Sequence, residues 1–142
     1  MEEVNLYVAT DVKGPRRQAG RGMYLLECLT SRGTQTRSKK LELEDTTENQ
    51  LTVTALAEEL ERITRPVKVT IWTDCQYVGG SILNGWPEKW EKAGWKNAKG
   101  EQIADAEKWQ SVLVGIRLHE ISVRIREHHA YASWMKNELK KP

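Results

Sequence analysis

The chain has 142 residues, with 22 Lys and Arg against 20 Asp and Glu, a formal net charge of +2 and 39% hydrophobic residues. This near-balance of charge excludes a histone-like polycation and an acidic tail protein, and the hydrophobic content argues against wholesale disorder. No apolar run is long enough to span a membrane, the acidic N-terminus is not a secretory signal, and Cys28 and Cys75 form no CxxC pair. The sequence therefore predicts one soluble domain over residues 1–142, located in the reducing cytoplasm.

The first 45 residues have the pattern of an antiparallel meander. Apolar residues alternate with other side chains from Val4 to Val8, which predicts a strand that ends near Asp11. A basic loop rich in Gly and Arg is expected over residues 12–22. Two further strands are expected over residues 23–29 and 34–43, the second of them polar on one face.

The pattern then changes to strands that alternate with helices. Apolar residues at helical spacing follow Thr47, which is a candidate N-cap, and Pro66 closes this helix. A strand is expected over residues 67–73, and Asn84-Gly85 ends the helix that follows it. The remaining elements are expected as helices over residues 87–93, 105–118 and 133–140 and a fifth strand over residues 120–126. The expected order is β-β-β-α-β-α-α-α-β-α.

Two carboxylates stand directly after expected strands. Asp11 follows the first strand and Asp74 follows the fourth. Ligands gather at the carboxyl ends of the strands in a mixed α/β sheet. If these two strands are neighbours, the two carboxylates share one edge and face each other. The other interpretation of Asp74 is a helix N-cap, and these residues alone leave both interpretations open.

A segment rich in Trp is the chain's most unusual stretch. Six Trp occur in a chain without Phe, and Trp86, Trp90 and Trp95 fall within ten residues. These rings are interleaved with the basic residues Lys89, Lys92, Lys96 and Lys99. An aromatic and basic protrusion over residues 85–99 would suit nucleic acid, whereas the alternative is that one or two of the Trp pack its own base. Trp72 and Trp109 are expected in the core, and both Cys as small buried groups.

Three segments resemble bacterial type 1 ribonuclease H. Residues 67–78 (VKVTIWTDCQYV) resemble that family's strand-to-helix turn, and residues 46–51 (TTENQL) resemble the entry into its first helix. Residues 90–96 (WEKAGWK) resemble the basic protrusion that grips the DNA strand of a hybrid. The resemblance implies an α/β ribonuclease H-like fold, a five-stranded mixed sheet with three antiparallel and two parallel strands, flanked by helices.

The family cleaves the RNA strand of RNA–DNA hybrids with Mg²⁺ or Mn²⁺, using four carboxylates and a mobile histidine. Carried over by position, the resemblance implies catalytic and metal-binding roles for Asp11 and Asp74, and a catalytic role for His129. Without the resemblance, His129 in a polar loop reads as a solvated side chain. The second and fourth carboxylates fall on Thr52 and Asn137, so two of the four are replaced.

This loss changes the expected metal chemistry. Two cations about 4 Å apart need several carboxylates to balance their charge. Two carboxylates suit one Mg²⁺ or Mn²⁺ at most, held weakly without substrate, because Mg²⁺ often uses one or two carboxylates plus substrate phosphates. Two substitutes stay open: Glu48 lies one helical turn before Thr52 and reaches inward poorly, and Lys13 could neutralise Asp11 and Asp74 without metal unless it belongs to the loop.

The nucleic-acid surface that the resemblance implies is better preserved. Thr47 falls where the family holds a phosphate, and Asn49 and Gln76 fall where it touches base edges in the minor groove. Glu48 stands where the family has Asn, and its charge opposes phosphate. The protrusion adds Trp86, Trp90, Lys92, Trp95 and Lys96 as candidate contacts.

The leading hypothesis is a degenerate ribonuclease H that binds RNA–DNA hybrid and cleaves it weakly or not at all. The first alternative is an active metal-dependent ribonuclease H with a rearranged site, and the second is a protein-interaction module. We expect a monomer whose partner is nucleic acid, preferably an RNA–DNA hybrid, with no membrane and no small-molecule cofactor. The retained Thr47, Asn49 and Gln76 favour binding over the interaction module, and the lost carboxylates favour binding over cleavage.

Overall fold

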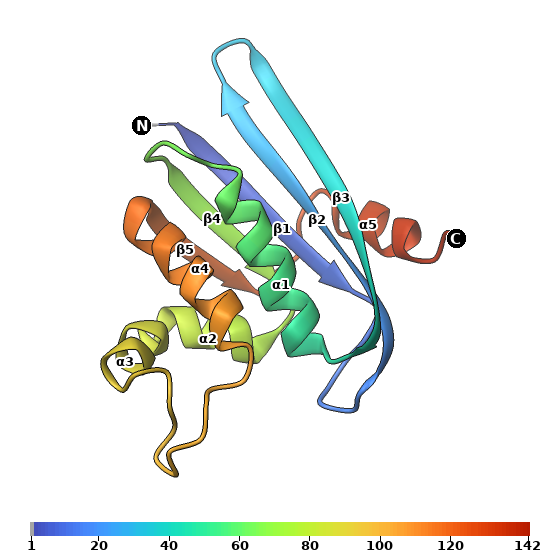
Figure 1. Cartoon of the computed structure of the whole chain (residues 1–142). Coiled ribbons are helices and arrows are strands. Elements are labelled where there is room, and N and C mark those ends of the chain that lie inside the picture. The colour runs from blue at the N-terminus through green and yellow to red at the C-terminus, as the bar shows by residue number, and fades with distance from the viewer. Residues whose placement is uncertain (1) are drawn as a thin grey trace.

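The computed structural model describes residues 2–142 and contains one five-stranded sheet (Figure 1). The strands are β1 (Glu3–Thr10), β2 (Gln18–Thr30), β3 (Gly33–Thr46), β4 (Lys68–Thr73) and β5 (Glu120–Ile125). Their order across the sheet is β3-β2-β1-β4-β5, with antiparallel pairing from β1 to β3 and parallel pairing of β1 with β4 and β4 with β5. The expected mixed sheet with three antiparallel strands is confirmed.

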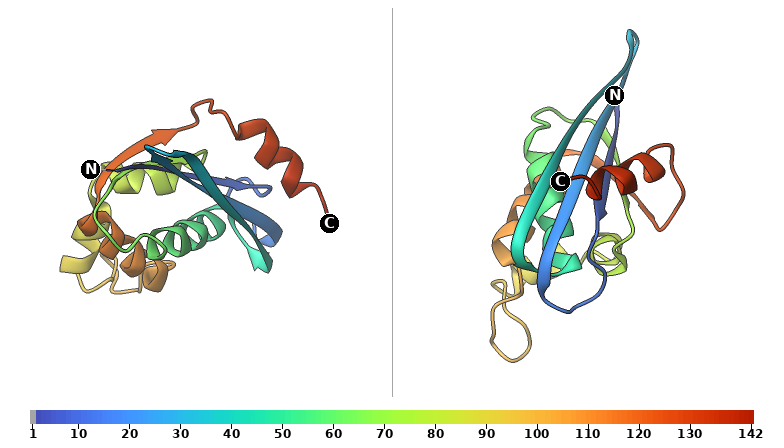
Figure 2. Two further views of the ribbon diagram at one scale, coloured as in Figure 1. Left: turned by 90° about the horizontal axis from the view of Figure 1, so that it is seen from above. Right: turned by 90° about the vertical axis from the view of Figure 1, so that its right-hand side faces the viewer.

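Five helices cover the two faces of the sheet unequally. They are α1 (Glu48–Glu61), α2 (Gln76–Leu83), α3 (Trp86–Lys92), α4 (Ala106–Leu118) and α5 (Ala132–Leu139). α1 packs on β1 and β2 with α4 beside it, whereas α5 lies against β1 and β2 from the other face (Figure 2). No helix within residues 2–142 has the length and apolar character needed to cross a bilayer.

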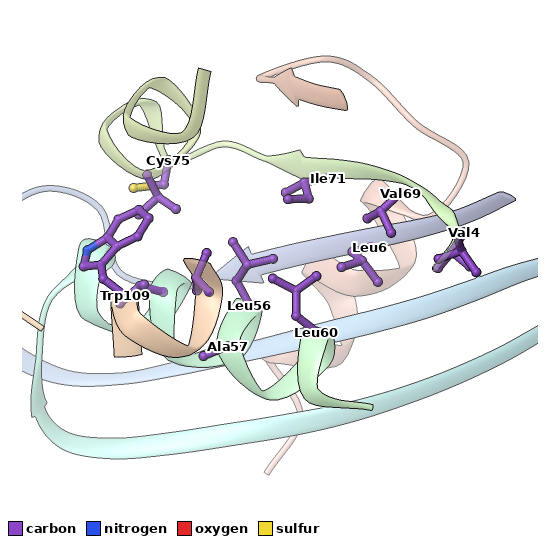
Figure 3. Packing of buried hydrophobic residues seen from close by; sticks show 13 residues of the cluster. Val4, Leu6, Leu56, Ala57, Leu60, Val69, Ile71, Cys75 and Trp109 are labelled. Carbon is purple, nitrogen blue, oxygen red and sulfur yellow. The ribbon is translucent and has the colours of Figure 1, made fainter. Parts of the chain in front are cut away.

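The main core lies between the sheet and α1. Alternate residues of β1 and β4 point to this face, and they meet Leu56 and Leu60 of α1 and Trp109 of α4 (Figure 3). Trp109 is 1% exposed, as expected of a core residue, and Cys75 is buried at the same interface. Trp72, on the opposite face of β4, is partly buried and packs against a second hydrophobic cluster that includes Tyr7 and Met135, so it lies at the margin of a core on the α5 face.

The β2–β3 hairpin is longer than the sequence pattern predicts. β2 begins at Gln18 rather than residue 23, and β3 continues to Thr46 rather than residue 43. The extra pairing joins Gly20 to Leu43 and Gln18 to Thr46, with an irregular register between them. Gly20 fits because a Cβ there would lie 2.3 Å from a methyl group of Val12. The buried positions of this segment are Gly20, Gly22 and Thr46, so it lacks the apolar alternation that identifies a half-buried strand.

Candidate metal and nucleic-acid site

Asp11 and Asp74 lie at the same edge of the sheet. β1 and β4 are parallel neighbours with Val8 opposite Thr73, so the chain leaves both strands on one side. Asp74 is the next residue after β4, and Asp11 follows the end of β1. Both side chains belong to exposed residues. The condition on which the sequence argument depended, that these two strands are neighbours, is met.

Asp11 is fixed by Arg21 of the neighbouring strand. The Asp11 carboxylate accepts the backbone N–H of Arg21 at 2.7 Å, and the Asp11 N–H donates to the Arg21 carbonyl at 2.9 Å. The Arg21 guanidinium donates to the carbonyls of Leu139 (3.4 Å) and Lys141 (2.6 Å) and pairs with Glu42 at 2.8 Å. Arg21 therefore connects Asp11, through its backbone, with the C-terminal end of α5, through its side chain.

Asp74 does not cap a helix. α2 begins at Gln76 with Cys75 at the N-cap, and no side chain hydrogen-bonds to that end. The Cys75 N–H instead donates to the Thr73 hydroxyl at 3.0 Å, and this turn keeps Asp74 ahead of the capping position. The Asp74 carbonyl accepts the Nε–H of Arg126 at 3.2 Å. The N-cap interpretation is therefore wrong, which leaves the Asp74 carboxylate facing solvent at the edge shared with Asp11.

Thr52 and Asn137, on which the resemblance places the second and fourth carboxylates, are neutral residues in different surroundings. Thr52 is 2% exposed in the second turn of α1, close to the buried Cys75 thiol. That thiol donates to the Asn49 amide oxygen at 3.1 Å, and burial raises its pKa, which disfavours the thiolate. Asn137 is exposed on α5. Within residues 2–142, no three side chains of His, Cys, Asp or Glu come together as a group that could hold a metal ion.

Glu48 and Lys13 interact with each other. One Glu48 carboxylate oxygen accepts the Gly14 N–H at 3.0 Å, and the other lies 4.0 Å from the Lys13 ammonium. The Lys13 side chain is 61% exposed and belongs to the β1–β2 loop, which agrees with the loop alternative for this residue. The structure thus holds Glu48 against this loop.

His129 is packed rather than solvated. Its ring lies 4.4 Å from the Tyr7 ring and 5.7 Å from the Trp72 ring, centroid to centroid. Its Nδ1 accepts the backbone N–H of Tyr131 at 3.1 Å. Burial lowers the pKa of His129, and the nearby Asp74 charge partly opposes this. The interpretation of His129 as a solvated loop residue is therefore wrong, and the ring has defined neighbours on the α5 face of the sheet.

The three polar residues expected to meet nucleic acid stand at two helix starts. Thr47 is the N-cap of α1, and its side-chain oxygen accepts the Gln50 N–H at 3.2 Å. Gln76 is exposed in the first turn of α2. Asn49 joins the two helix starts through its hydrogen bond from Cys75. The free backbone N–H groups at such helix starts suit phosphate.

The Trp-rich protrusion has two partly buried rings and one exposed ring. Trp90 packs edge-on against the core residue Trp109, with centroids 5.1 Å apart, and Trp95 is partly buried against the same core. Trp86 is 37% exposed, with its ring 6.2 Å from that of Tyr77. The expectation that one or two of these Trp pack the base of the protrusion agrees with this arrangement, which leaves Trp86 as the most accessible ring.

The positive charge of the protrusion's lysines is offset by fewer free acidic side chains than its composition suggests. Glu91 of α3 accepts two hydrogen bonds from the Arg117 guanidinium of α4, at 3.0 and 2.5 Å. The Arg117 guanidinium thus neutralises Glu91, which is one of the acidic side chains that reduce the positive charge of this segment. The lysines of the segment are all exposed: Lys89, Lys92, Lys96 and Lys99.

A buried polar cluster on the α5 face was not predicted from the sequence. Glu27 of β2 is 9% exposed and accepts hydrogen bonds from Asn5, Tyr7 and Tyr131. One signal could have found it. Glu27 shares its strand face with Met23 and Leu25, so the β-strand alternation places a carboxylate where an apolar side chain is expected.

Comparisons of this chain with a family model and with curated proteins identify the same family. The RNase H family model matches residues 2–139. The ribonuclease H of Granulibacter bethesdensis is 38% identical over 86 residues, which are 61% of this chain and 57% of that protein, so less than two thirds of that relative is spanned. The ribonuclease H of Hydrogenovibrio crunogenus is 33% identical over 122 residues, which are 86% of this chain and 80% of that protein.

Solved structures share the fold. LC9-RNase H1, a type 1 RNase H with the type 2 active-site motif, superposes with a TM-score of 0.74 at 21% identity, covering 97% of this chain and 70% of that one. The foamy viral protease-reverse transcriptase in complex with RNA/DNA hybrid gives a TM-score of 0.63 at 17% identity, covering 97% of this chain and 19% of that one. Since the family model covers nearly the whole chain and these neighbours share its fold, the chain belongs to the RNase H family.

Proposed function

We propose that this chain binds RNA–DNA hybrid as a degenerate member of its family and cleaves the RNA strand weakly or not at all. One observation carries the proposal: within residues 2–142, no third carboxylate joins Asp11 and Asp74 in a group that could hold metal. Thr52, buried beside Cys75, offers no charge to balance a second cation. The Glu48 carboxylate accepts the Gly14 N–H and pairs with the Lys13 ammonium, which argues against its use as a substitute metal ligand.

RNase H enzymes generally depend on a divalent metal, and the donors present here fit one ion rather than two. Asp11 has one oxygen engaged by the Arg21 N–H, so its other oxygen and the exposed Asp74 carboxylate are the donors that remain. Mg²⁺ can be held by one or two carboxylates together with substrate phosphates. When bound, such an ion supplies charge that orients a phosphate. In this proposal, Asp11 and Asp74 share one Mg²⁺ or Mn²⁺ with the nucleic acid.

Calorimetry of Mg²⁺ binding tests this donor set directly. We expect no Mg²⁺ site of micromolar affinity in the free protein, because binding to two solvated carboxylates does not offset the free-energy cost of removing water from Mg²⁺. Asp74→Asn is the control variant, since it removes the negative charge of one carboxylate without changing the size of the side chain. Two saturable Mg²⁺ sites of micromolar affinity that disappear in Asp74→Asn would contradict the proposal.

The proposed hybrid contacts lie at the starts of α1 and α2 and on the protrusion. Thr47, Asn49 and Gln76 supply hydroxyl and amide groups, which suit phosphate and the minor-groove edges of an RNA-containing duplex. Binding should favour hybrid modestly over duplex DNA. It should also weaken as salt rises, because Lys and Arg side chains displace counterions from the phosphates that they contact, and the decrease should be shallow because only a few such side chains meet phosphates. A titration of both duplexes at two salt concentrations measures this, and equal affinity for both would count against a hybrid-specific surface.

Trp86 is the most exposed of the three Trp in the protrusion, so Trp86→Ala is expected to weaken hybrid binding by about 1–3 kcal/mol. Trp90→Ala is the matched comparison. Its ring packs on Trp109, so this variant should lose more unfolding free energy than Trp86→Ala. Fluorescence anisotropy with labelled hybrid and chemical unfolding of the same samples measure the two effects. Unchanged affinity in Trp86→Ala would show that the ring does not contact nucleic acid.

A further inference from the structure

A network of polar and aromatic side chains on the α5 face ends at the His129 ring. Its centre is the buried Glu27 carboxylate on β2. One Glu27 oxygen accepts the Asn5 amide N–H at 2.8 Å and the Tyr7 hydroxyl at 3.4 Å, and the other accepts the Tyr131 hydroxyl. A carboxylate is suited to this place because it is an acceptor at both oxygens, whereas an amide would turn one donor toward these O–H and N–H groups.

The first connection to His129 runs through the loop that carries it. This loop leaves β5, and Tyr131 stands at its end as the N-cap residue of α5. The Tyr131 hydroxyl is bound by Glu27, its ring packs edge-on against Tyr7 at 5.1 Å, and its backbone N–H donates to His129 Nδ1 at 3.1 Å. The anchor on β2 therefore holds the far end of the loop across the face of the sheet.

The second connection runs through the rings beneath His129. The Asn5 amide that donates to Glu27 also accepts the indole N–H of Trp72 at 3.0 Å. Trp72 and Tyr7 stack with centroids 5.5 Å apart and together form the surface on which the His129 ring lies. The rings beneath the imidazole and the residue that donates to its Nδ1 are thus both connected by hydrogen bonds to the Glu27 carboxylate.

We propose that Glu27 is the positioning residue of the candidate site: through Tyr131, Tyr7 and Asn5 it holds the His129 imidazole in a fixed orientation near Asp74. The Tyr131 N–H occupies Nδ1, so Nε2 is the ring nitrogen left to donate to a ligand at the edge where Asp11 and Asp74 lie. Any contact of His129 with hybrid rests on the proposed function, but the placement of the ring does not need nucleic acid. Glu27 itself touches no ligand in this scheme.

NMR of the three histidine rings in the full chain tests the placement. Ring currents from Tyr7 and Trp72 should shift the His129 carbon-bound protons upfield of those of the exposed His128. Tyr131→Phe, which removes one oxygen, and Glu27→Gln are each expected to move the His129 signals toward those of His128. The buried His119, whose Nδ1 accepts the Val67 N–H, reports in the same spectra whether each variant is folded.

Tyr24→Phe is the matched control. It also removes a tyrosine hydroxyl that takes part in a hydrogen bond, to Arg62 at 2.7 Å, but on the other face of the sheet. The His129 signals should stay in place in this variant. The proposal is overturned if they also stay in place in Tyr131→Phe, the mildest change, while the His119 signals show a folded protein. If Glu27→Gln does not fold, the His129 signals of Tyr131→Phe alone decide whether the Glu27 network positions the ring.

Hybrid affinity gives a second readout that separates this inference from the proposed function. If the held ring meets hybrid, Tyr131→Phe and His129→Ala should each weaken binding, and the double variant should bind no more weakly than His129→Ala. Additive losses would contradict positioning through His129. Absence of hybrid binding in the wild type would overturn the proposed function, and the NMR result would still decide whether Glu27 positions the ring.

Discussion

Thr52→Glu combined with Asn137→Asp is expected to raise Mg²⁺-dependent cleavage of RNA–DNA hybrid at least about 100-fold, which corresponds to about 2.7 kcal/mol of activation free energy. The two substitutions add carboxylates at the α1 and α5 positions on which the family resemblance places the second and fourth metal ligands. Two-metal hydrolysis needs such a set, because the ions hold the attacking and leaving oxygens only when nearby carboxylates balance their charge. Arg21 binds Asp11 through its backbone and the C-terminal end of α5 through its guanidinium, and this link favours a fourth ligand supplied from that helix.

The control for this gain is Thr54→Glu with Asn137→Asp. Thr54 lies two residues further along α1 and is partly buried, so the control adds the same charges while its carboxylate points elsewhere around the helix. Chemical unfolding of each variant distinguishes an inactive protein from an unfolded one, since Thr52 is 2% exposed and a larger side chain must displace neighbours. Equal rates in the two double variants would show that the missing carboxylates do not limit cleavage.

Glu59→Met is expected to raise the unfolding free energy at pH 7 by about 1–3 kcal/mol, the cost of a buried polar group without partners. Glu59 is 0% exposed on α1, and neither carboxyl oxygen has a hydrogen-bond partner within the described chain. Met has a flexible apolar side chain that fills such a space. The neighbouring Glu58→Met is the control, since Glu58 forms a surface pair with Lys39 that contributes about 0–1 kcal/mol.

The stabilisation in Glu59→Met should also depend on pH. Burial, with a smaller contribution from Glu58, raises the pKa of Glu59 well above its usual value. The folded protein therefore binds a proton that the unfolded chain releases above about pH 4.3, so wild-type stability falls as the pH rises from there toward the raised pKa. The difference between the variant and the wild type should be larger at pH 7 than at pH 4. Thermal or urea unfolding at both pH values measures it, and an equal difference would contradict this account.

The strands with one buried face were the most predictable part of the fold. Val4, Leu6 and Val8 alternate with residues of the opposite face, and that alternation alone located β1 and, through its end, Asp11. The added length of β2 and β3 was not predictable from periodicity. The buried positions in that added length are Gly20, Gly22 and Thr46 rather than large apolar residues, and they pair through the backbone, so no apolar side-chain pattern records them.

The candidate site was predictable where it depends on topology and not where it depends on tertiary contacts. The two strand ends bring Asp11 and Asp74 to one edge, because β1 and β4 are the parallel neighbours that this expectation required. The packing of His129 on Tyr7 and Trp72 depends on three elements far apart in the chain, and no local pattern joins them. Glu48 was considered as a substitute ligand, but its hydrogen bond from Gly14 depends on how the β1–β2 loop folds back.

Cleavage of an end-labelled RNA–DNA hybrid by the wild-type chain, with Mg²⁺ and then with Mn²⁺, tests the central claim most directly. Asp74→Ala under the same conditions sets the background, and a gel-shift of the same hybrid shows that it is bound. The account predicts binding with a cleavage rate at or only slightly above that of Asp74→Ala in either metal. Multiple-turnover cleavage in Mg²⁺ that Asp74→Ala abolishes would contradict it.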